Sequence, residues 1–140
     1  MYVRENDVTE AKTILVAVED SVLADSLRFS LELEGFDVEL CDERSLPGAM
    51  ARSDAAQGCV VLDQDVFARM IEGKRDTRFA AFAIPIVLMV EHKTERVMAH
   101  AEAAGAIRVL EKPVLGGVLF EAIRTAMDGR IRLQREQGSS

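Results

Sequence analysis

The sequence predicts one α/β domain in which a five-stranded parallel sheet is covered by helices on both faces. Short apolar runs alternate with helical patterns along the chain, and polar residues hardly interrupt the runs. Unbroken apolar strands are typical of parallel sheets, because both faces of such a sheet are buried. A length of 140 residues suits a single domain with one core.

Five apolar segments are the expected strands, and the second is the weakest of them. In chain order they span Ile14 to Val18, Phe36 to Cys41, Gly58 to Leu62, Ile84 to Val90, and Ile107 to Leu110. A segment with helical character follows each one, so the predicted order is a βα unit repeated five times.

Three of the helices are predicted from apolar residues at intervals of three and four. Leu23, Leu27 and Leu31 mark the first helix. We expect Ser21 to cap its start and Gly35 to end it in a left-handed conformation. The last two helices are marked by Val97, Ala101 and Ala104, and then by Leu115, Leu119, Ala122, Ile123 and Ala126.

The two middle helices have weaker patterns. Segments Ser45 to Ser53 and Val66 to Phe79 are the expected helices. Pro47-Gly48 interrupts the first pattern and Gly73 interrupts the second. We therefore expect the limits of both helices to differ from these by several residues.

The composition limits the partners and the location. A formal net charge of −7 argues against direct nucleic-acid binding, which requires clustered basic residues. No apolar run approaches the roughly 20 residues that span a bilayer, and the start of the chain lacks a signal-peptide pattern. We expect a cytoplasmic protein without membrane contact, in which Cys41 and Cys59 are reduced core thiols.

The two ends of the chain differ in character from its centre. Residues 1–12 are polar with little periodicity, and residues 129–140 run through charged residues into Gly and Ser. We expect a flexible leader over 1–12, the domain over 13–128, and the end of the last helix with a flexible tail over 129–140.

Polar residues gather where the expected strands end. Ligands of open parallel sheets bind outside the carboxyl ends of the strands, so these side chains should share one edge. Carboxylates at such an edge can hold a hard cation such as Mg²⁺. The residues are Glu19 and Asp20, Asp63 and Asp65, Glu91, and Glu111 with Lys112.

Asp63 and Lys112 are the core of a candidate phosphorylation site at this edge. Asp63 closes the apolar run that begins at Gly58, and Lys112 stands directly before Pro113. A carboxylate at the mouth of a buried strand can attack a phosphoryl group, and a nearby ammonium stabilises the added negative charge. This pairing is the best indication of function in the sequence.

Several stretches resemble the CheY-like receiver domains of bacterial response regulators, over roughly Lys12 to Asp128. Gly58-Cys-Val-Val-Leu-Asp63 is similar to the phosphoacceptor strand in its FixJ-type form. Gly105-Ala106 with Glu111-Lys-Pro113 is similar to the end of the family's fifth strand, and Asp25-Ser-Leu27 with Phe29 to its first helix. The resemblance implies a flavodoxin-like (βα)5 fold with strand order 2-1-3-4-5.

The resemblance also implies a role in two-component phosphorelay signalling. Asp63 would accept a phosphoryl group from a sensor histidine kinase or a phosphotransfer protein, and Lys112 would contact it. Mg²⁺ would be held by Glu19 or Asp20, by Asp63 and by the backbone carbonyl of Asp65. With no room for an output domain after Asp128, we expect a single-domain, non-enzymatic regulator that acts on a downstream protein.

Four features depart from the family pattern. Val18 replaces the first of two acidic residues, which weakens the expected Mg²⁺ site. Val90 replaces a hydroxyl residue, and Val109 replaces the aromatic residue that takes part in the readout. The family's Met-Pro-Gly loop has no counterpart in the residues after Asp65, and we expect Thr94 to start a helix rather than to replace the missing hydroxyl.

These departures leave alternatives open. The chain is either a receiver phosphorylated on Asp63 or a pseudo-receiver that docks partners whatever the state of Asp63. Asp63-Gln-Asp65-Val66 also fits the short motif of haloacid-dehalogenase-like phosphatases, in which the first Asp is a nucleophile. A homodimer through the last helix, extended by Ile131 and Leu133, is a further expectation.

Overall fold

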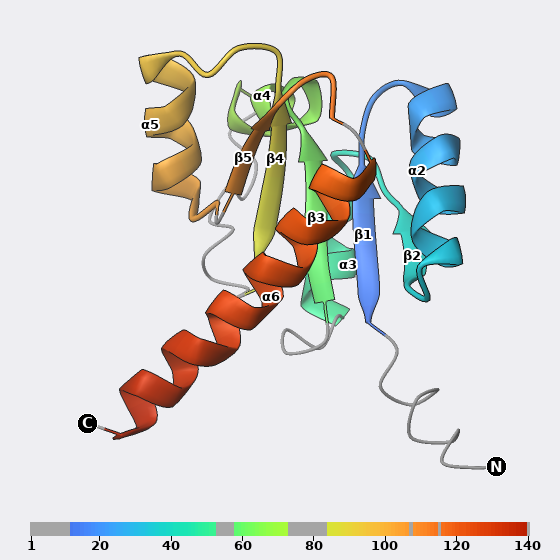
Figure 1. Cartoon of the computed structure of the whole chain (residues 1–140). Helices are drawn as coiled ribbons and strands as arrows, with labels where there is room; N and C mark the ends of the chain where they lie inside the picture. Colours follow the sequence, from blue (N-terminus) through green and yellow to red (C-terminus); the bar gives the residue numbers. More distant parts are fainter. Residues whose placement is uncertain (1–11, 53–57, 73–83, 107, 115, 140) are drawn as a thin grey trace, which may run out of the picture.

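Five parallel strands form one sheet in the order β2-β1-β3-β4-β5 (Figure 1). The computed structural model describes residues 12–52, 58–72, 84–106, 108–114 and 116–139. The strands are β1 Thr13–Ala17, β2 Asp37–Leu40, β3 Gly58–Asp63, β4 Ile86–Val90 and β5 Arg108–Glu111. The helices are α2 Ser21–Leu33, α3 Leu46–Arg52, α4 Gln64–Glu72, α5 Glu95–Ala104 and α6 Gly116–Ser139. The predicted fold class and strand order are confirmed.

Helices cover both faces of the sheet, and each strand sends alternate side chains to the two faces. Ile14 and Val16 of β1 pack in the layer formed with α2 and α6. Leu15 and Ala17 pack in the layer formed with α3, α4 and α5. In Figure 1, α6 crosses one face of the sheet while α3 and α4 lie behind it. Because β1, β3 and β4 are covered on both sides, they have the unbroken apolar sequences described above.

The second strand is weak in sequence because it lies at the edge of the sheet. β2 pairs with β1 alone, from Thr13 opposite Asp37 to Val16 opposite Leu40. Three of its residues are exposed and one is partly buried. An edge strand that carries Asp37 and Glu39 also offers a poor template for pairing with another chain.

The first helix is capped by Asp20, so the predicted cap, Ser21, is wrong. The Asp20 carboxylate accepts hydrogen bonds from the backbone amides of Val22 at 2.9 Å and Leu23 at 3.3 Å. Asp20 has extended backbone angles, and Ser21 is the first helical residue. Both types are good caps, and the position at which the chain leaves β1 decides between them. Gly35 ends the helix with φ +98°, as predicted.

Helices α3 and α4 differ in their limits from the prediction. Pro47 is the second residue of α3, so Pro47-Gly48 does not interrupt this helix, because the first turn needs no amide from proline. Helix α4 begins at Gln64, directly after β3. The described part of α4 ends at Glu72, and the rest of the predicted segment lies outside the described residues.

The last two helices begin and end in different ways. Thr94 caps α5 and its hydroxyl accepts from the Val97 amide at 3.2 Å, while Gly105 ends it with φ +86°. The backbone of α6 is helical as far as Ser139, and its last turns project beyond the sheet (Figure 1). Among the described helices, none combines the length and the apolarity needed to cross a membrane.

Candidate functional site

Asp63 is the last residue of β3 and is buried. Its side chain is 4% exposed, although it carries a carboxylate. Because Ala17 of β1 pairs with Leu62 and Met89 of β4 pairs with Asp63, the carboxylate lies where the central strands end. A buried carboxylate has to be paired or hydrogen-bonded.

Lys112 supplies that partner. Its ammonium lies 2.8 Å from Oδ1 of Asp63, and its side chain is 23% exposed. The backbone amide of Lys112 donates to the carbonyl of Val90 at 2.8 Å, which fixes the chain just after β5 against the end of β4. The structure therefore brings together the two residues that the sequence marks as the core of the site.

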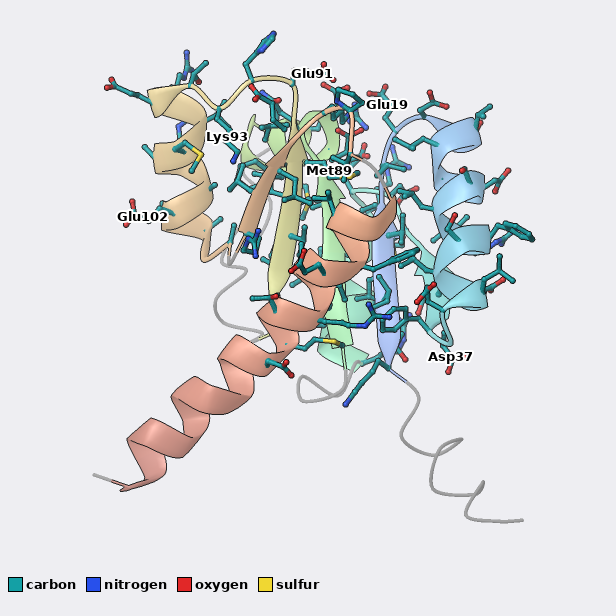
Figure 2. The ribbon with its side chains drawn as sticks, viewed as in Figure 1. Glu19, Asp37, Met89, Glu91, Lys93 and Glu102 are labelled. Carbon is teal, nitrogen blue, oxygen red and sulfur yellow. The ribbon has the colours of Figure 1, made fainter. Side chains whose placement is uncertain are left out.

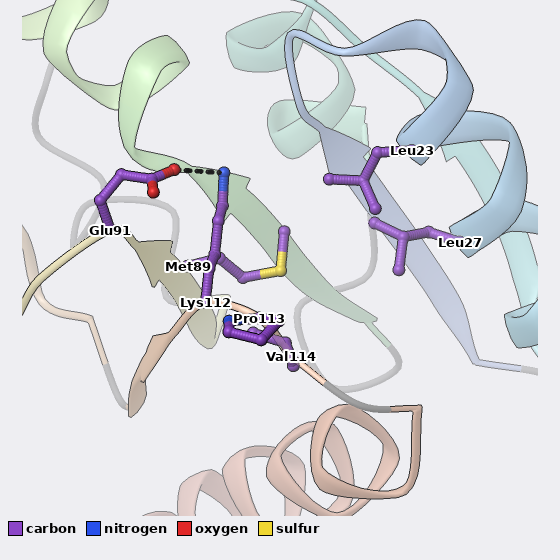
Figure 3. Close-up of a pocket in the computed structure, with 7 residues that line it drawn as sticks. All are labelled: Leu23, Leu27, Met89, Glu91, Lys112, Pro113 and Val114. Atoms are coloured by element: carbon purple, nitrogen blue, oxygen red, sulfur yellow. Dashed lines mark ion pairs between the residues drawn. The ribbon is translucent and has the colours of Figure 1, made fainter.

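Glu91 is a second partner for the ammonium. Its carboxylate lies 3.4 Å from Nζ of Lys112 (Figure 3). Partial desolvation acts to lower the pKa of Lys112, but the hydrogen bond and charge of Asp63, followed by those of Glu91, outweigh it. The net result is a pKa raised above the ordinary 10.5. Lys112 is therefore a fixed positive charge at neutral pH.

Gln64 is a site residue that the sequence did not reveal. Its side-chain oxygen accepts a hydrogen bond from the backbone amide of Glu91 at 2.8 Å. This contact joins the first residue of α4 to the segment that follows β4, directly beside Asp63. A polar residue immediately after a buried strand is the only sequence signal for it, and that signal is weak.

Glu111 ties the segment after β4 to the end of β5. Its carboxylate accepts from the backbone amide of Lys93 at 3.2 Å and lies 3.7 Å from Nδ1 of His92. Figure 2 shows Glu91 and Lys93 at the carboxyl ends of the strands, where Glu19 also lies, whereas Asp37 lies at the other end of the sheet. The carboxylate of Glu111 therefore holds the loop that follows β4.

The acidic residues expected to hold Mg²⁺ are not brought together. Asp20 uses its carboxylate to cap α2. The carboxylate of Glu19 lies 3.2 Å from the guanidinium of Arg69 on α4, and the same guanidinium lies 3.5 Å from Glu43. Asp65 is exposed in the first turn of α4, where its carbonyl faces the amide four residues on.

These residues do not fit a Mg²⁺ site as they are arranged. Within the described part of the chain, no group of three or more His, Cys, Asp or Glu residues is placed to hold a metal ion. Mg²⁺ needs nearly octahedral oxygen ligands, usually from one or two carboxylates together with water and phosphate. Only Asp63 of the expected set has its carboxylate buried at the site.

Val18, Val90 and Val109, which depart from the receiver pattern, pack in or against the core. Val90 is fully buried in the layer formed with α3, α4 and α5, and Val109 packs against the same layer. Val18 is buried on the other face. None of these side chains can donate a hydrogen bond to a phosphoryl oxygen. The site therefore consists of Asp63, Lys112, Glu91 and Gln64.

A pocket of about 380 Å³ adjoins Lys112 (Figure 3). It opens between the first turns of α2 and the segment after β5, and its walls are mainly apolar. The ammonium of Lys112 and the carboxylate of Glu91 supply its charged groups. The lining residues are Leu23, Leu27, Met89, Glu91, Lys112, Pro113 and Val114.

The solved structures similar to this chain include response-regulator receiver domains. Full-length FixJ from B. japonicum is 26% identical over 91% of this chain, with a TM-score of 0.68. The chain has the fold of a response-regulator receiver domain. A CheY-like receiver domain from Methanospirillum hungatei is 18% identical over 87% of this chain and 98% of its own, with a TM-score of 0.67.

One structure of the same fold contains a modified aspartic acid. A response regulator from Burkholderia pseudomallei contains a phosphorylated aspartic acid, a calcium ion and citrate. It is 16% identical over 90% of this chain and 72% of its own, with a TM-score of 0.67. No protein-family model and no curated protein matches this sequence. The chain spans 63% of the length of full-length FixJ.

Proposed function

We propose that this receiver domain accepts a phosphoryl group on Asp63 in two-component signal transduction. The observation that carries the proposal is the pair of Asp63 and Lys112, whose charged atoms are 2.8 Å apart at the carboxyl edge of the sheet. A buried carboxylate with a fixed ammonium beside it suits a group that gains negative charge in the reaction. The likeness to FixJ supports the same conclusion.

The chemical step is the transfer of a phosphoryl group from a phosphohistidine of a sensor kinase or phosphotransfer protein. A carboxylate oxygen of Asp63 attacks the phosphorus, and the phosphorus–nitrogen bond breaks. The bonding electrons return to the imidazole of the donor, and an acyl phosphate forms on Asp63. Lys112 then pairs with a phosphoryl oxygen, and Glu91 holds the ammonium in place meanwhile.

We propose that the signal leaves this domain through contact with another protein. The pocket beside Lys112 supports this, because it places apolar side chains of α2 next to the residue that would bind the phosphoryl group. A partner that fills the pocket would be in contact with both. Direct binding to nucleic acid is not part of the proposal, since the chain has a net charge of −7.

A second candidate is a docking module that works without phosphorylation. It is favoured by the state of the acidic residues, because Asp20 caps a helix and Glu19 pairs with Arg69. It is also favoured by Val90, which stands where the receiver pattern has a hydroxyl residue. Valine cannot donate a hydrogen bond to a phosphoryl oxygen, and such a bond to a charged group is worth about 1.5 to 3 kcal/mol. In this role Asp63 and Lys112 would only stabilise the fold.

A hydrolytic enzyme is the least supported alternative. In that mechanism the second Asp of the motif is a general acid or base, whereas Asp65 is exposed on α4. The strand that should end in Ser or Thr ends in Val90. We therefore propose a signalling role without catalytic turnover.

Labelling with a small phosphodonor separates the two leading candidates. The chain is incubated with acetyl phosphate and Mg²⁺, and its intact mass is measured. The proposal predicts the added mass of one phosphoryl group in the wild type and in Asp65→Asn, and none in Asp63→Asn. No added mass in the wild type, or equal labelling of Asp63→Asn, would favour the docking module.

A further inference from the structure

Arg69 binds two carboxylates that come from different parts of the sheet edge. Its guanidinium lies 3.2 Å from Glu19, which follows β1, and 3.5 Å from Glu43, which lies between β2 and α3. Arg69 itself lies on α4, which follows β3. One side chain thus connects the segments that follow three neighbouring strands, at the edge where the resemblance implies a metal ion.

Each carboxylate of this group at the edge has a partner within the chain. Asp63 and Glu91 share Lys112, Glu19 and Glu43 share Arg69, and Asp20 is bound by two backbone amides. A divalent cation would therefore find no carboxylate of this group without a partner. It would have to displace a guanidinium, which stays protonated under all ordinary conditions.

A tethered cation competes strongly with a free one. Because Arg69 is held on the same domain, its effective concentration at Glu19 is on the order of millimolar or above. The hydrogen bond that Arg69 donates to Glu19 raises the pKa of Arg69, and the charges of Glu19 and Glu43 raise it further. The positive charge is thus always present beside these carboxylates.

We infer that Arg69 is a built-in counter-cation that takes the place of a divalent metal ion at the carboxyl edge of the sheet. Wild-type protein then binds divalent cations weakly, and removal of the Arg69 charge creates a cation site at Glu19 and Glu43. The inference concerns the unphosphorylated chain and does not rest on phosphorylation of Asp63.

Titration with Mn²⁺ tests this inference directly. Free Mn²⁺ is measured by electron paramagnetic resonance in the presence of wild-type protein or Arg69→Gln. Gln keeps most of the side-chain length and removes the charge. The expected result is an affinity at least about tenfold higher for Arg69→Gln, equivalent to about 1.4 kcal/mol. Equal affinities of the two proteins would overturn the inference.

Three further variants locate the effect. Arg124→Gln is the matched control, because Arg124 pairs with Glu34 at 2.9 Å on another part of the surface and its loss changes the net charge equally. It should bind Mn²⁺ as the wild type does, and a gain equal to that of Arg69→Gln would reduce the effect to net charge and sink the inference. Arg69→Lys should keep cations out, whereas a tenfold gain in this variant would contradict us.

The last variant places the new site. Adding Glu19→Gln to Arg69→Gln should abolish the gained affinity, since it removes the carboxylate that Arg69 holds most closely. If the double variant kept the full gain, the cation would be bound elsewhere and the inference would fail. The side chains of Arg69 and Glu19 are 39% and 54% exposed. Ion pairs of this exposure contribute little to stability, so all the variants should fold, as thermal melting will verify.

Discussion

Lys112 and Asp63 carry opposite charges in surroundings with little access to water, and each is the charge partner of the other. Asp63 is 4% exposed and Lys112 is 23% exposed, so removing one member leaves a charge with poor access to water. We predict that Lys112→Met lowers the free energy of unfolding by about 2 kcal/mol, because the carboxylate is left buried without its partner. Urea unfolding followed by circular dichroism measures the loss.

The matched control for this prediction is an exposed ion pair. Arg52 and Glu39 lie 3.1 Å apart with side chains 69% and 47% exposed, and Arg52→Met should cost no more than about 0.5 kcal/mol. Combining Asp63→Asn with Lys112→Met should restore part of the stability, since neither charge remains. A loss of similar size in the two Met variants would show that burial of the site has no energetic effect.

The raised pKa of Lys112 predicts how stability depends on pH. The folded pKa lies above the ordinary 10.5, so the stabilising contribution is complete below that pH and is lost as pH rises through the folded pKa. The difference in unfolding free energy between wild type and Lys112→Met should be constant from about pH 8 to 10 and shrink above that range. A difference that grows above pH 10 would contradict this account.

At the scale of the elements, the first helix depends on Asp20. Its carboxylate accepts from the amides of Val22 and Leu23, so we predict that Asp20→Ala costs about 1 kcal/mol of stability. Ser21→Ala is the control and should have almost no effect, because Ser21 is already the first residue of α2. The reverse order of the two losses, measured by thermal melting, would restore Ser21 as the cap.

Two glycines should respond in opposite directions to replacement by alanine. Gly35 has φ +98°, where a side chain is strained, so Gly35→Ala should lose about 1 kcal/mol. Gly117 is the second residue of α6, and a methyl group there meets no atom within 4 Å. Gly117→Ala should gain up to about 0.5 kcal/mol from higher helix propensity, because the position lies in the first turn of the helix. Chemical denaturation of both variants checks the signs.

The whole fold was predictable because burial on both faces leaves a clear trace in sequence. The strands of the centre, such as β3 and β4, are buried along their entire length and appear as apolar runs. Asp63 and Lys112 were predictable for the same reason, since each stands at the end of such a run. In a parallel sheet those ends meet at one edge.

The remaining site contacts depend on geometry that periodicity does not determine. Arg69 reaches Glu19 and Glu43 because of the rotation of α4 and the path of the loop after β2. Gln64 reaches Glu91 because α4 begins without a loop. Asp20 is the cap because α2 begins one residue earlier than the sequence predicts. Side-chain partners of this kind are determined by tertiary structure, so the sequence shows the residues but not the pairs.

The core as a whole protects both thiols. Burial raises the pKa of Cys59 to about 12, and burial followed by the charge of Glu39 raises that of Cys41 to about 11. Both cysteines are free; Cys59 is buried, whereas Cys41 is only partly buried and packs against the core. We predict that Ellman's reagent at neutral pH labels them slowly in folded protein and rapidly after unfolding in urea. Fast labelling of Cys59 in folded protein would contradict the described core.

The most direct test of the central claim is to trap the acyl phosphate on Asp63. The chain is mixed with a phosphorylated histidine-kinase or phosphotransfer domain, and the product is reduced with borohydride, which converts an aspartyl phosphate to homoserine. Peptide mass spectrometry then identifies the reduced residue. The account predicts homoserine at position 63 in the wild type, with Asp20, Asp65 and the other carboxylates unchanged. Homoserine at another position, or at none while a control receiver domain is labelled, would contradict it.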